Sequence, residues 1–415
     1  DPERTHAEFA RFSQRDADYY MEFLADWEQA KSAFAKANNT PIGWGKPLDA
    51  LLDELPNGSV WRRRRALSAV DVIMHEFTEE HIQAFLLWEA CQTFGSVDLP
   101  GSGVLPYSIM GGRQKRSWTI PLGGSGKLTD ALVSVIEDNG GRIECGVTVS
   151  RLLLDRDRCV GIESTDGVQY LANEAVLSTI HVKHLLDMAP REAWGDGFTY
   201  GVETYDIGIP LFAAFLVMDE VPTFAGKTAA DTAVSSGLAL WPQDVVELVR
   251  DIRDRKPVTG SAWTLIATPS IVDPSRAPEG KQTVKLLVPC SHVPPYGGGS
   301  WDDVKEQHAD AMLEYVATAI PNLNADHVEA RIVKSPLDIE RWNPHMINGC
   351  AHGGDKGVPF SGPLRPAAGW ASHAMPIPGL YQTGGTTHPG GSITGSPGRN
   401  AAMVMMKDLG LEFPG

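Results

Sequence analysis

Apolar residues recur at helical spacing near the start of the chain. Ser13 is followed three residues later by Asp16, a pair typical of a capped helix start. The apolar stripe that follows consists of Tyr20, Leu24, Trp27 and Phe34. Residues that lie three, four or seven apart share one face of a helix. The pattern therefore predicts a long helix whose apolar face packs into a core.

A second helical pattern covers residues 68–94. Its periodicity is interrupted near Phe77, and Thr78 with the acidic residues after it is typical of a new helix start. The pattern predicts two helices joined by a tight break. Residues 1–110 are thus expected to form a helical region that caps or covers a substrate.

Short strand-like runs replace the helical pattern beyond residue 120. A helix is predicted over 128–138, followed by a strand over 142–149. A small antiparallel meander is predicted at 151–155, 159–165 and 169–172. Residues 175–179 then predict a buried strand, which runs into a helix over 181–188 that His181 begins.

Residues 191–345 alternate long apolar strands with a helix. The strands are predicted at 209–218, 262–268, 283–288 and 328–334, and the helix at 301–319. Several strands with one helix alongside predict a mixed sheet, which we interpret as a separate substrate domain. Its apolar side chains are each expected to be ordinary core, although some could line a tunnel for an apolar molecule.

The last seventy residues, 346–415, end in a strand, a glycine-dense turn and a helix. The strand is predicted at 380–383, six glycines fall between 384 and 398, and a helix is predicted over 400–409. Glycine permits positive φ and close approach to another surface. A helix start with free N–H groups attracts an anion or a partly negative ring. Spacing alone predicts a binding turn or an ordinary loop equally well.

The composition excludes some classes of function. A net charge of -16 argues against a nucleic-acid partner. The five cysteines form no C-x-x-C pair, which favours free thiols in a reducing compartment. No metal site is predicted. No apolar run is long enough for a transmembrane helix, so we expect a cytoplasmic protein. Peripheral membrane contact through the apolar helices at 68–92 stays an open alternative.

The glycine-dense end carries a specific motif. The matching residues are Pro378, Gly379, Leu380, Tyr381, Gly384, Thr387, His388, Pro389, Gly390, Gly391, Gly395, Pro397, Gly398, Arg399, Asn400, Ala401 and Ala402. In this order they resemble the flavin-contacting segment of the phytoene-desaturase-like FAD-dependent oxidoreductases, within the amine-oxidase-like flavoproteins. A second matching group is Pro336, Asp338, Glu340, Arg341, Asn343, Pro344, Gly349, Gly353 and Gly354. The likeness also covers the opening of the chain and Pro121 to Leu128, so it extends over most of the sequence.

The resemblance implies an α/β fold with two dinucleotide-binding-type parts. One is a Rossmann-like FAD domain, formed by residues 111–190 and 346–415, and the other is the mixed-sheet substrate domain. The family also has a βαβ unit with G-x-G-x-x-G, which holds the ADP half of FAD. No such motif follows an early strand here. We therefore expect a second polypeptide or a separate fragment to supply this unit.

The resemblance also implies the site residues. Those expected to bind FAD are Val147, Ser178, Thr179, Gly384, Gly385, Thr387, Pro389, Gly390, Gly391, Ser392, Ile393 and Thr394. His388 is the titratable residue expected beside the flavin ring. Its role is either to handle a proton or to shape the turn with Pro389, and the sequence does not decide between them.

Flavin chemistry explains why the chain needs no catalytic triad or metal cluster. The expected function is a desaturase or dehydrogenase that transfers a hydride from an apolar, isoprenoid- or carotenoid-like molecule to flavin N5. A flavin-dependent isomerase and an amine oxidase are alternatives. A non-catalytic subunit that scaffolds a heteromeric flavoenzyme is an alternative from another class, and the missing nucleotide-binding unit keeps it open.

Overall fold

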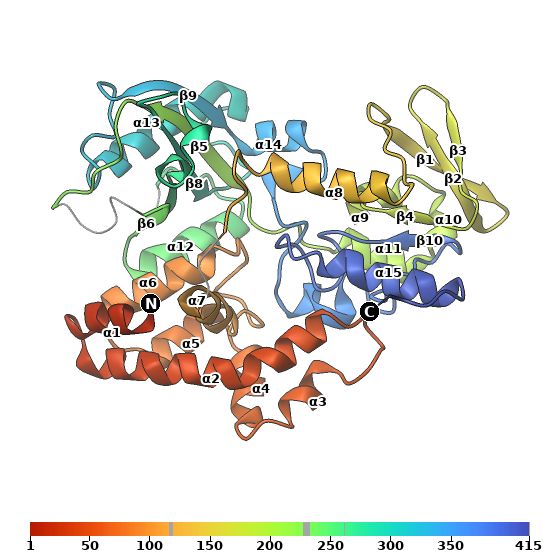
Figure 1. Ribbon diagram of the computed structural model, residues 1–415, viewed down its shortest axis with the longest axis horizontal. Coiled ribbons are helices and arrows are strands. Elements are labelled where there is room, and N and C mark those ends of the chain that lie inside the picture. Colours follow the sequence, from red (N-terminus) through yellow and green to blue (C-terminus); the bar gives the residue numbers. More distant parts are fainter. Residues whose placement is uncertain (116–118, 227–232, 261, 415) are drawn as a thin grey trace.

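The computed structural model describes residues 1–115, 119–226, 233–260 and 262–414 of the chain. Figure 1 shows helices at the lower left, a large sheet at the upper left and a second α/β half on the right. The predicted boundaries at residues 110, 190 and 345 stay predictions. Residues 116–118, 227–232 and 261 of those regions lie outside the described residues.

The first group is helical, as expected. It contains α1 (Pro2–Ala10), α2 (Gln14–Asn38), α3 (Leu48–Leu52), α4 (Gly58–Ala66), α5 (Ala69–Glu76), α6 (Glu80–Cys91) and α7 (Leu105–Lys115). The Ser13 side chain accepts a hydrogen bond from the Asp16 N–H, so the predicted cap of α2 is confirmed. The aromatic stripe of α2 packs against α5, α6 and α7 in one core. No helix in the described ranges is long and apolar enough to cross a membrane.

The break between α5 and α6 lies where it was expected, but its cap is different. Glu79, and not Thr78, caps α6, because its carboxylate accepts from the N–H groups of His81 and Ile82. The N–H groups of Thr78 and Glu79 instead donate to the buried carboxylate of Asp16 in α2. This bond network fixes α6 against α2, which matters because α6 lines a cavity described below.

The large sheet has five strands in the order β6-β7-β8-β5-β9. Their bounds are β5 (Leu211–Met218), β6 (Ser235–Ala239), β7 (Trp263–Ala267), β8 (Gln282–Pro289) and β9 (Val328–Lys334). The sheet was expected to be mixed, but each described pairing is antiparallel. Apolar alternation marks a strand and does not report its direction, which depends on the connections. Helix α13 (Trp301–Ala317) packs on the sheet as expected.

Two elements of this half have no counterpart in the sequence-based prediction. Strand β6 contains serine, glycine and alanine, which give a weak strand signal. Helix α12 (Pro242–Arg253) begins at a proline and packs on the helical core through Val245, Val249 and Ile252. These elements join the large sheet to the first helical group.

The other half contains two small sheets. The meander of β1 (Val149–Asp155), β2 (Arg158–Ser164) and β3 (Gln169–Leu171) is confirmed. Strands β4 (Val176–Ser178) and β10 (Leu380–Gln382) form a parallel pair. The helices of this half are α8 (Gly126–Asp138), α9 (Val182–Leu186), α10 (Arg191–Trp194), α11 (Asp196–Glu203) and α15 (Ser396–Asp408), and α14 (Pro336–Trp342) joins it to the large sheet. The strand predicted over 142–149 is wrong, since β1 begins at Val149 and 142–148 are irregular.

That irregular segment and α8 share one property: both are exposed. None of the residues of α8 is buried, although Leu132 and Val135 are apolar and are 57% and 58% exposed. In Figure 1, α8 lies above α9 and α15, and the meander rises beyond it on the right. A strand persists only when a neighbour takes its hydrogen bonds, and the parallel sheet of the described residues is β4 and β10 alone. This half therefore presents an apolar helix face and an open sheet edge.

Candidate functional site

The two parallel strands end side by side and define the site. Gln382 pairs with Ser178, and the Thr383 N–H donates to the Ser178 carbonyl at 2.9 Å. Thr179 and Gly384 therefore leave the same edge of the sheet next to each other. Ligands of open α/β folds bind outside the carboxyl ends of parallel strands. The expected residues Ser178, Thr179 and Gly384 are thus brought together at the edge where a ligand would bind.

The glycines of the turn fall into two groups. A Cβ on Gly385 would lie 3.0 Å from the His352 carbonyl oxygen, and one on Gly391 would lie 2.7 Å from it. A Cβ on Gly390 would lie 3.3 Å from the Arg365 guanidinium carbon. At these three positions a side chain would come too close to neighbouring atoms of the protein, so tight packing favours glycine. Gly384 and Gly395, both at positive φ, meet no described atom closer than 3.8 Å, so they border open space.

Arg365 holds the glycine turn in place. Its side chain is buried. One Nη donates to the carbonyls of Asp355 and Phe360, both at 2.8 Å, while Nε and the other Nη donate to the Gly385 carbonyl. The planar fork of arginine can serve several acceptors at once. Arg365 thus ties segment 355–360 to the turn.

The apex of the turn is exposed. Ser392, Ile393 and Thr394 all face solvent, and Ile393 is 92% exposed at φ 57°. A β-branched residue in the left-handed region is an outlier, and such strain gathers at functional sites. Helix α15 follows with left-handed Gly395 as its N-cap, and the Thr394 hydroxyl accepts from the N–H of its first residue, Ser396, at 3.2 Å. The apex and the helix start therefore lie together on the open side of the turn.

His388 is anchored to the other end of the chain. Its Nε2 lies 3.0 Å from the Ala37 carbonyl at the end of α2. A carbonyl only accepts, so Nε2 carries the hydrogen, and buried Nδ1 has no partner among the described residues. Burial lowers the pKa of His388 and keeps the ring neutral. Thr387 is buried and donates to the Gly384 carbonyl at 3.1 Å, while half-buried Pro389 continues the turn.

Lys356 was not found by sequence reasoning. Its Nζ donates to the Ser392 hydroxyl at 3.0 Å, which places a cation at the apex of the turn. The pKa of Lys356 is lowered to about 8, mainly by burial. The positive charge of nearby Arg365 also lowers this pKa, and the negative charge of Asp355 opposes the change to a smaller extent. A single lysine between Asp355 and Gly357 matches no motif. Only the folding of residues 353–357 against the turn reveals it.

Val147 and Thr179 line one pocket together with three histidines. His181 begins α9 as expected, since its Nδ1 accepts from the Lys183 N–H at 3.2 Å. The His181 and His345 rings are 5.1 Å apart. Burial lowers the pKa of His181 to about 3, and the neighbouring histidines add to this effect. The pocket extends the site from the sheet edge toward the exposed segment before β1.

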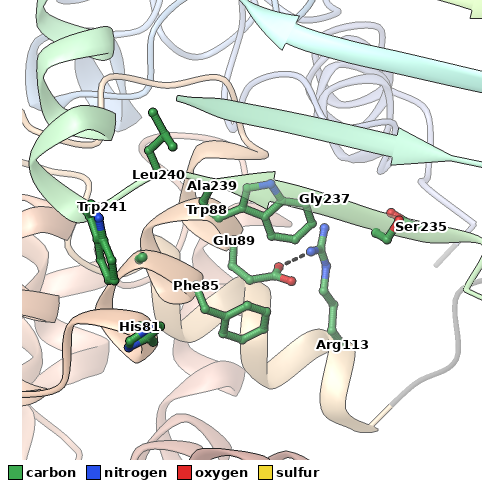
Figure 2. Close-up of a pocket in the computed structure, with 12 residues that line it drawn as sticks. His81, Phe85, Trp88, Glu89, Arg113, Ser235, Gly237, Ala239, Leu240 and Trp241 are labelled. Atoms are coloured by element: carbon green, nitrogen blue, oxygen red, sulfur yellow. Dashed lines mark hydrogen bonds and ion pairs between the residues drawn. The ribbon is translucent and has the colours of Figure 1, made fainter. Parts of the chain in front are cut away.

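A larger cavity of about 760 Å³ lies between α6, α7 and β6. Figure 2 shows aromatic side chains of Phe85, Trp88 and Trp241 around it, with Glu89 and Arg113 paired between them. Burial raises the pKa of Glu89 to about 7, although Arg113 opposes the rise. The volume of this cavity is within the range of small-molecule pockets, roughly 300–1,000 Å³.

The chain was compared with known proteins, and no family model matches it. It is 26% identical to the mouse pyridine nucleotide-disulfide oxidoreductase domain-containing protein 2, over 87% of this chain and 70% of that protein. It is 22% identical to a limonene dehydrogenase subunit of Castellaniella defragrans (100% and 78% covered) and 24% identical to the lycopene-forming phytoene desaturase of Pantoea ananas (99% and 79%). A putrescine oxidase structure shares the fold with a TM-score of 0.55 and 9% identity, over 94% of this chain and 74% of that chain.

These comparisons confirm three expectations. The resemblance to phytoene-desaturase-like oxidoreductases is confirmed, and so is the class of enzyme, since the relatives are named oxidoreductase, dehydrogenase and desaturase. The likeness to putrescine oxidase confirms the α/β class of the fold. The individual site residues stay predictions.

We predict that Arg365→Met destabilises the protein by about 3 kcal/mol, because the buried carbonyls of Asp355, Phe360 and Gly385 lose a charged donor. Urea unfolding measures the loss, and limited proteolysis should then cut within 384–395. Arg191→Met, at a surface arginine paired with Glu203, is the control and should change neither. An unchanged unfolding midpoint for Arg365→Met would contradict the role of Arg365 in holding the glycine turn.

We predict that stability rises between about pH 8 and 10 through Lys356. The pKa is about 8 in the folded state and about 10.4 when unfolded. The unfolded chain therefore binds more protons in this range, so raising the pH disfavours the unfolded state relative to the native state. Lys356→Met should flatten the rise measured by urea unfolding, while Lys31→Met on the surface of α2 should not. If the free energy of unfolding depended on pH identically in both variants, the role of Lys356 would be refuted.

Proposed function

We propose that this chain is the substrate-binding and flavin-covering part of an FAD-dependent oxidoreductase that dehydrogenates an apolar, isoprenoid-like molecule. One observation carries the proposal: the parallel strands β4 and β10 deliver Thr179 and Gly384 to one edge, and helix α15 begins after the same turn with glycine as its N-cap. Supporting it, relatives covering nearly the whole chain are named a limonene dehydrogenase subunit and a phytoene desaturase.

The residues present fit a flavin ring. Gly384 and Gly395 border open space, so a planar group can approach the backbone there. The N-cap of α15 is Gly395, which has no side chain, and the Thr394 hydroxyl accepts from the Ser396 N–H at 3.2 Å. The other N–H groups of the first turn favour a partly negative ring edge. The buried Nδ1 of His388 lacks a partner among the described residues. The ADP half would lie toward Val147, in the pocket that also contains Thr179.

FAD would supply the two-electron chemistry, with N5 accepting a hydride from the carbon that is oxidised. The residues of this chain would position the ring and set the electrostatic potential around it. The N–H groups of α15 and the ammonium of Lys356 stabilise negative charge at the turn apex. His388 stays neutral and fixes the turn against α2 through Ala37. The lone pair on its Nδ1 can accept a hydrogen bond.

The partner in this proposal is a βαβ unit with G-x-G-x-x-G on a second polypeptide. A two-stranded parallel sheet is not stable on its own, and parallel sheets are covered on both faces. Here β4 and β10 form such a pair, and Leu132 and Val135 of α8 face solvent. A βαβ unit would extend the sheet, cover the apolar face of α8 and bring the phosphate-binding turn beside Val147. The limonene dehydrogenase relative is itself named as one subunit of its enzyme, which is consistent with a shared site.

The alternatives make different predictions. A flavin-dependent isomerase would convert substrate without consuming an electron acceptor, and an amine oxidase would release hydrogen peroxide together with an amine. A non-catalytic scaffolding subunit would bind a partner that holds a complete FAD site of its own. The open edge at Thr179 and Gly384 favours the catalytic role, because a scaffold needs no ligand-sized opening there.

We predict that Thr179→Trp lowers the flavin content of the native complex roughly tenfold or more. Thr179 is exposed at the end of β4, so the indole occupies the opening without disturbing a core. Flavin absorbance per mole of protein measures the loss. Thr165→Trp, at an exposed turn of the meander, is the matched control. Equal flavin content in the two variants would refute the proposed location.

We predict that Leu132→Glu weakens partner binding about a hundredfold, because a carboxylate would be buried in an apolar interface. The chain alone should keep its melting temperature, since Leu132 is exposed. Tagged protein produced in its source cells, followed by mass spectrometry of co-purified chains, gives the readout. Ser134→Glu on the other face of α8 is the control. Retention of a G-x-G-x-x-G polypeptide by Leu132→Glu would overturn the docking surface.

A further inference from the structure

The five-stranded sheet has one covered face and one partly open face. Phe212, Ala214 and Leu216 of β5 are buried in the core that the sheet forms with α13. Successive side chains of a strand point to opposite faces, so Ala213 and Phe215 belong to the other face. Phe215 is 41% exposed. This second face, called the open face below, is therefore accessible at the Phe215 end of β5.

Two lysines flank β5 on the open face. Lys285 of β8 pairs with Phe215, and Lys334 of β9 pairs with Ala213, so both side chains lie on the same face as these residues. The Lys285 Nζ lies 5.6 Å from the centroid of the Phe215 ring, and the Lys334 Nζ lies 5.1 Å from that of Trp342 in α14. Neither ammonium forms a hydrogen bond or an ion pair with a described residue. The open face thus combines aromatic rings with two cations that lack an anion.

Lys285 is half-buried, and burial lowers its pKa below the ordinary value for lysine. An ammonium that leaves water without gaining a counter-ion costs stability. An apolar side chain at this position would avoid that cost, because Phe215 and Ala267 on the neighbouring strands are themselves apolar. A lysine here is therefore better explained by an anion that binds to it than by the stability of the sheet.

The open face leads toward the glycine turn. Four residues of β5 separate Phe215 from Leu211, which is roughly 13 Å of strand. Leu211 belongs to a small buried cluster against which Ala351 packs. The next residue is His352, whose carbonyl oxygen packs against Gly391 of the turn. An elongated molecule held at the Phe215 end can therefore extend along β5 toward the turn.

We propose that the open face binds an apolar molecule with a terminal carboxylate, which pairs with Lys285 while the hydrocarbon part lies along β5 toward the glycine turn. A carboxylate supplies the anion that both lysines lack. A hydroxyl brings no charge, and an ammonium would add to the positive charge. The aromatic rings cover the hydrocarbon part. The further claim that this acid is the molecule that is dehydrogenated rests on the proposed function, whereas its binding does not require flavin.

The test measures the binding of three probes to the native purified protein, together with any polypeptide that accompanies it. The probes are farnesoic acid, farnesol and farnesylamine, which share one isoprenoid chain and differ at the end. Equilibrium dialysis, below the concentrations at which the probes form micelles, gives each Kd. We expect the acid to bind about tenfold more tightly than the alcohol and the amine. Equal binding of the three probes, or tighter binding of the alcohol or the amine, would refute carboxylate recognition.

Lys285→Met keeps most of the length of the side chain but removes its charge. We expect it to weaken the binding of farnesoic acid about tenfold while farnesol binding stays unchanged, which also shows that the open face is intact. Lys281→Met, at a lysine that pairs with Glu329 just before the same strand, is the matched control and should change no Kd. An unchanged preference for the acid in Lys285→Met would overturn the role of Lys285.

Two further outcomes separate this inference from the proposed function. Absence of binding by all three probes, with flavin still held by the native protein, would overturn the inference and leave the proposed function intact. Lysine-dependent binding of the acid by a protein that purifies without flavin would support the binding site and contradict the proposed function alone.

Discussion

The buried guanidinium of Arg365 is the interaction on which the candidate site depends. It donates to backbone carbonyls of Asp355, Phe360 and Gly385, and Gly390 packs against it. Without side chains at 385, 390 and 391, the turn lies flat on segment 352–365. This leaves Gly384, Gly395 and the start of α15 open on the other side. One arginine thus decides which face of the glycine turn is packed and which face is available to a ligand.

The second constraint is a set of hydrogen bonds between residues that are far apart in the sequence, which join the end of α2 to the glycine turn and α15. His388 reaches Ala37, the Ser396 hydroxyl donates to the Asn39 side chain at 2.8 Å, and Asn400 donates to the Asn38 carbonyl at 2.9 Å. The end of α2 is thereby bound to the start of α15. Since α2 also anchors α6 through Asp16, the cavity and the glycine turn share one support. The same framework therefore positions the walls of the cavity and the glycine turn.

Local sequence patterns predicted the helices and strands themselves, but they did not predict the tertiary contacts around these elements. The caps of α2 and α9, the meander and the strand before the glycine turn follow from residue spacing, and the motif near Gly384 pointed to the site. The strand predicted at 142–149 is absent because pairing depends on a neighbour that the described chain does not provide. Lys356 and the ion pair of Glu89 with Arg113 carry no motif. They emerge only when segments separated by many residues fold together, as when Lys356 meets Ser392.

The central claim is that this chain completes a flavin site with a second polypeptide. The most direct measurement is the visible absorption spectrum of the native purified complex, with a mass spectrum of each polypeptide in it. The account predicts a flavin spectrum together with a second chain or fragment that carries G-x-G-x-x-G. A folded chain that purifies alone and without flavin would contradict it.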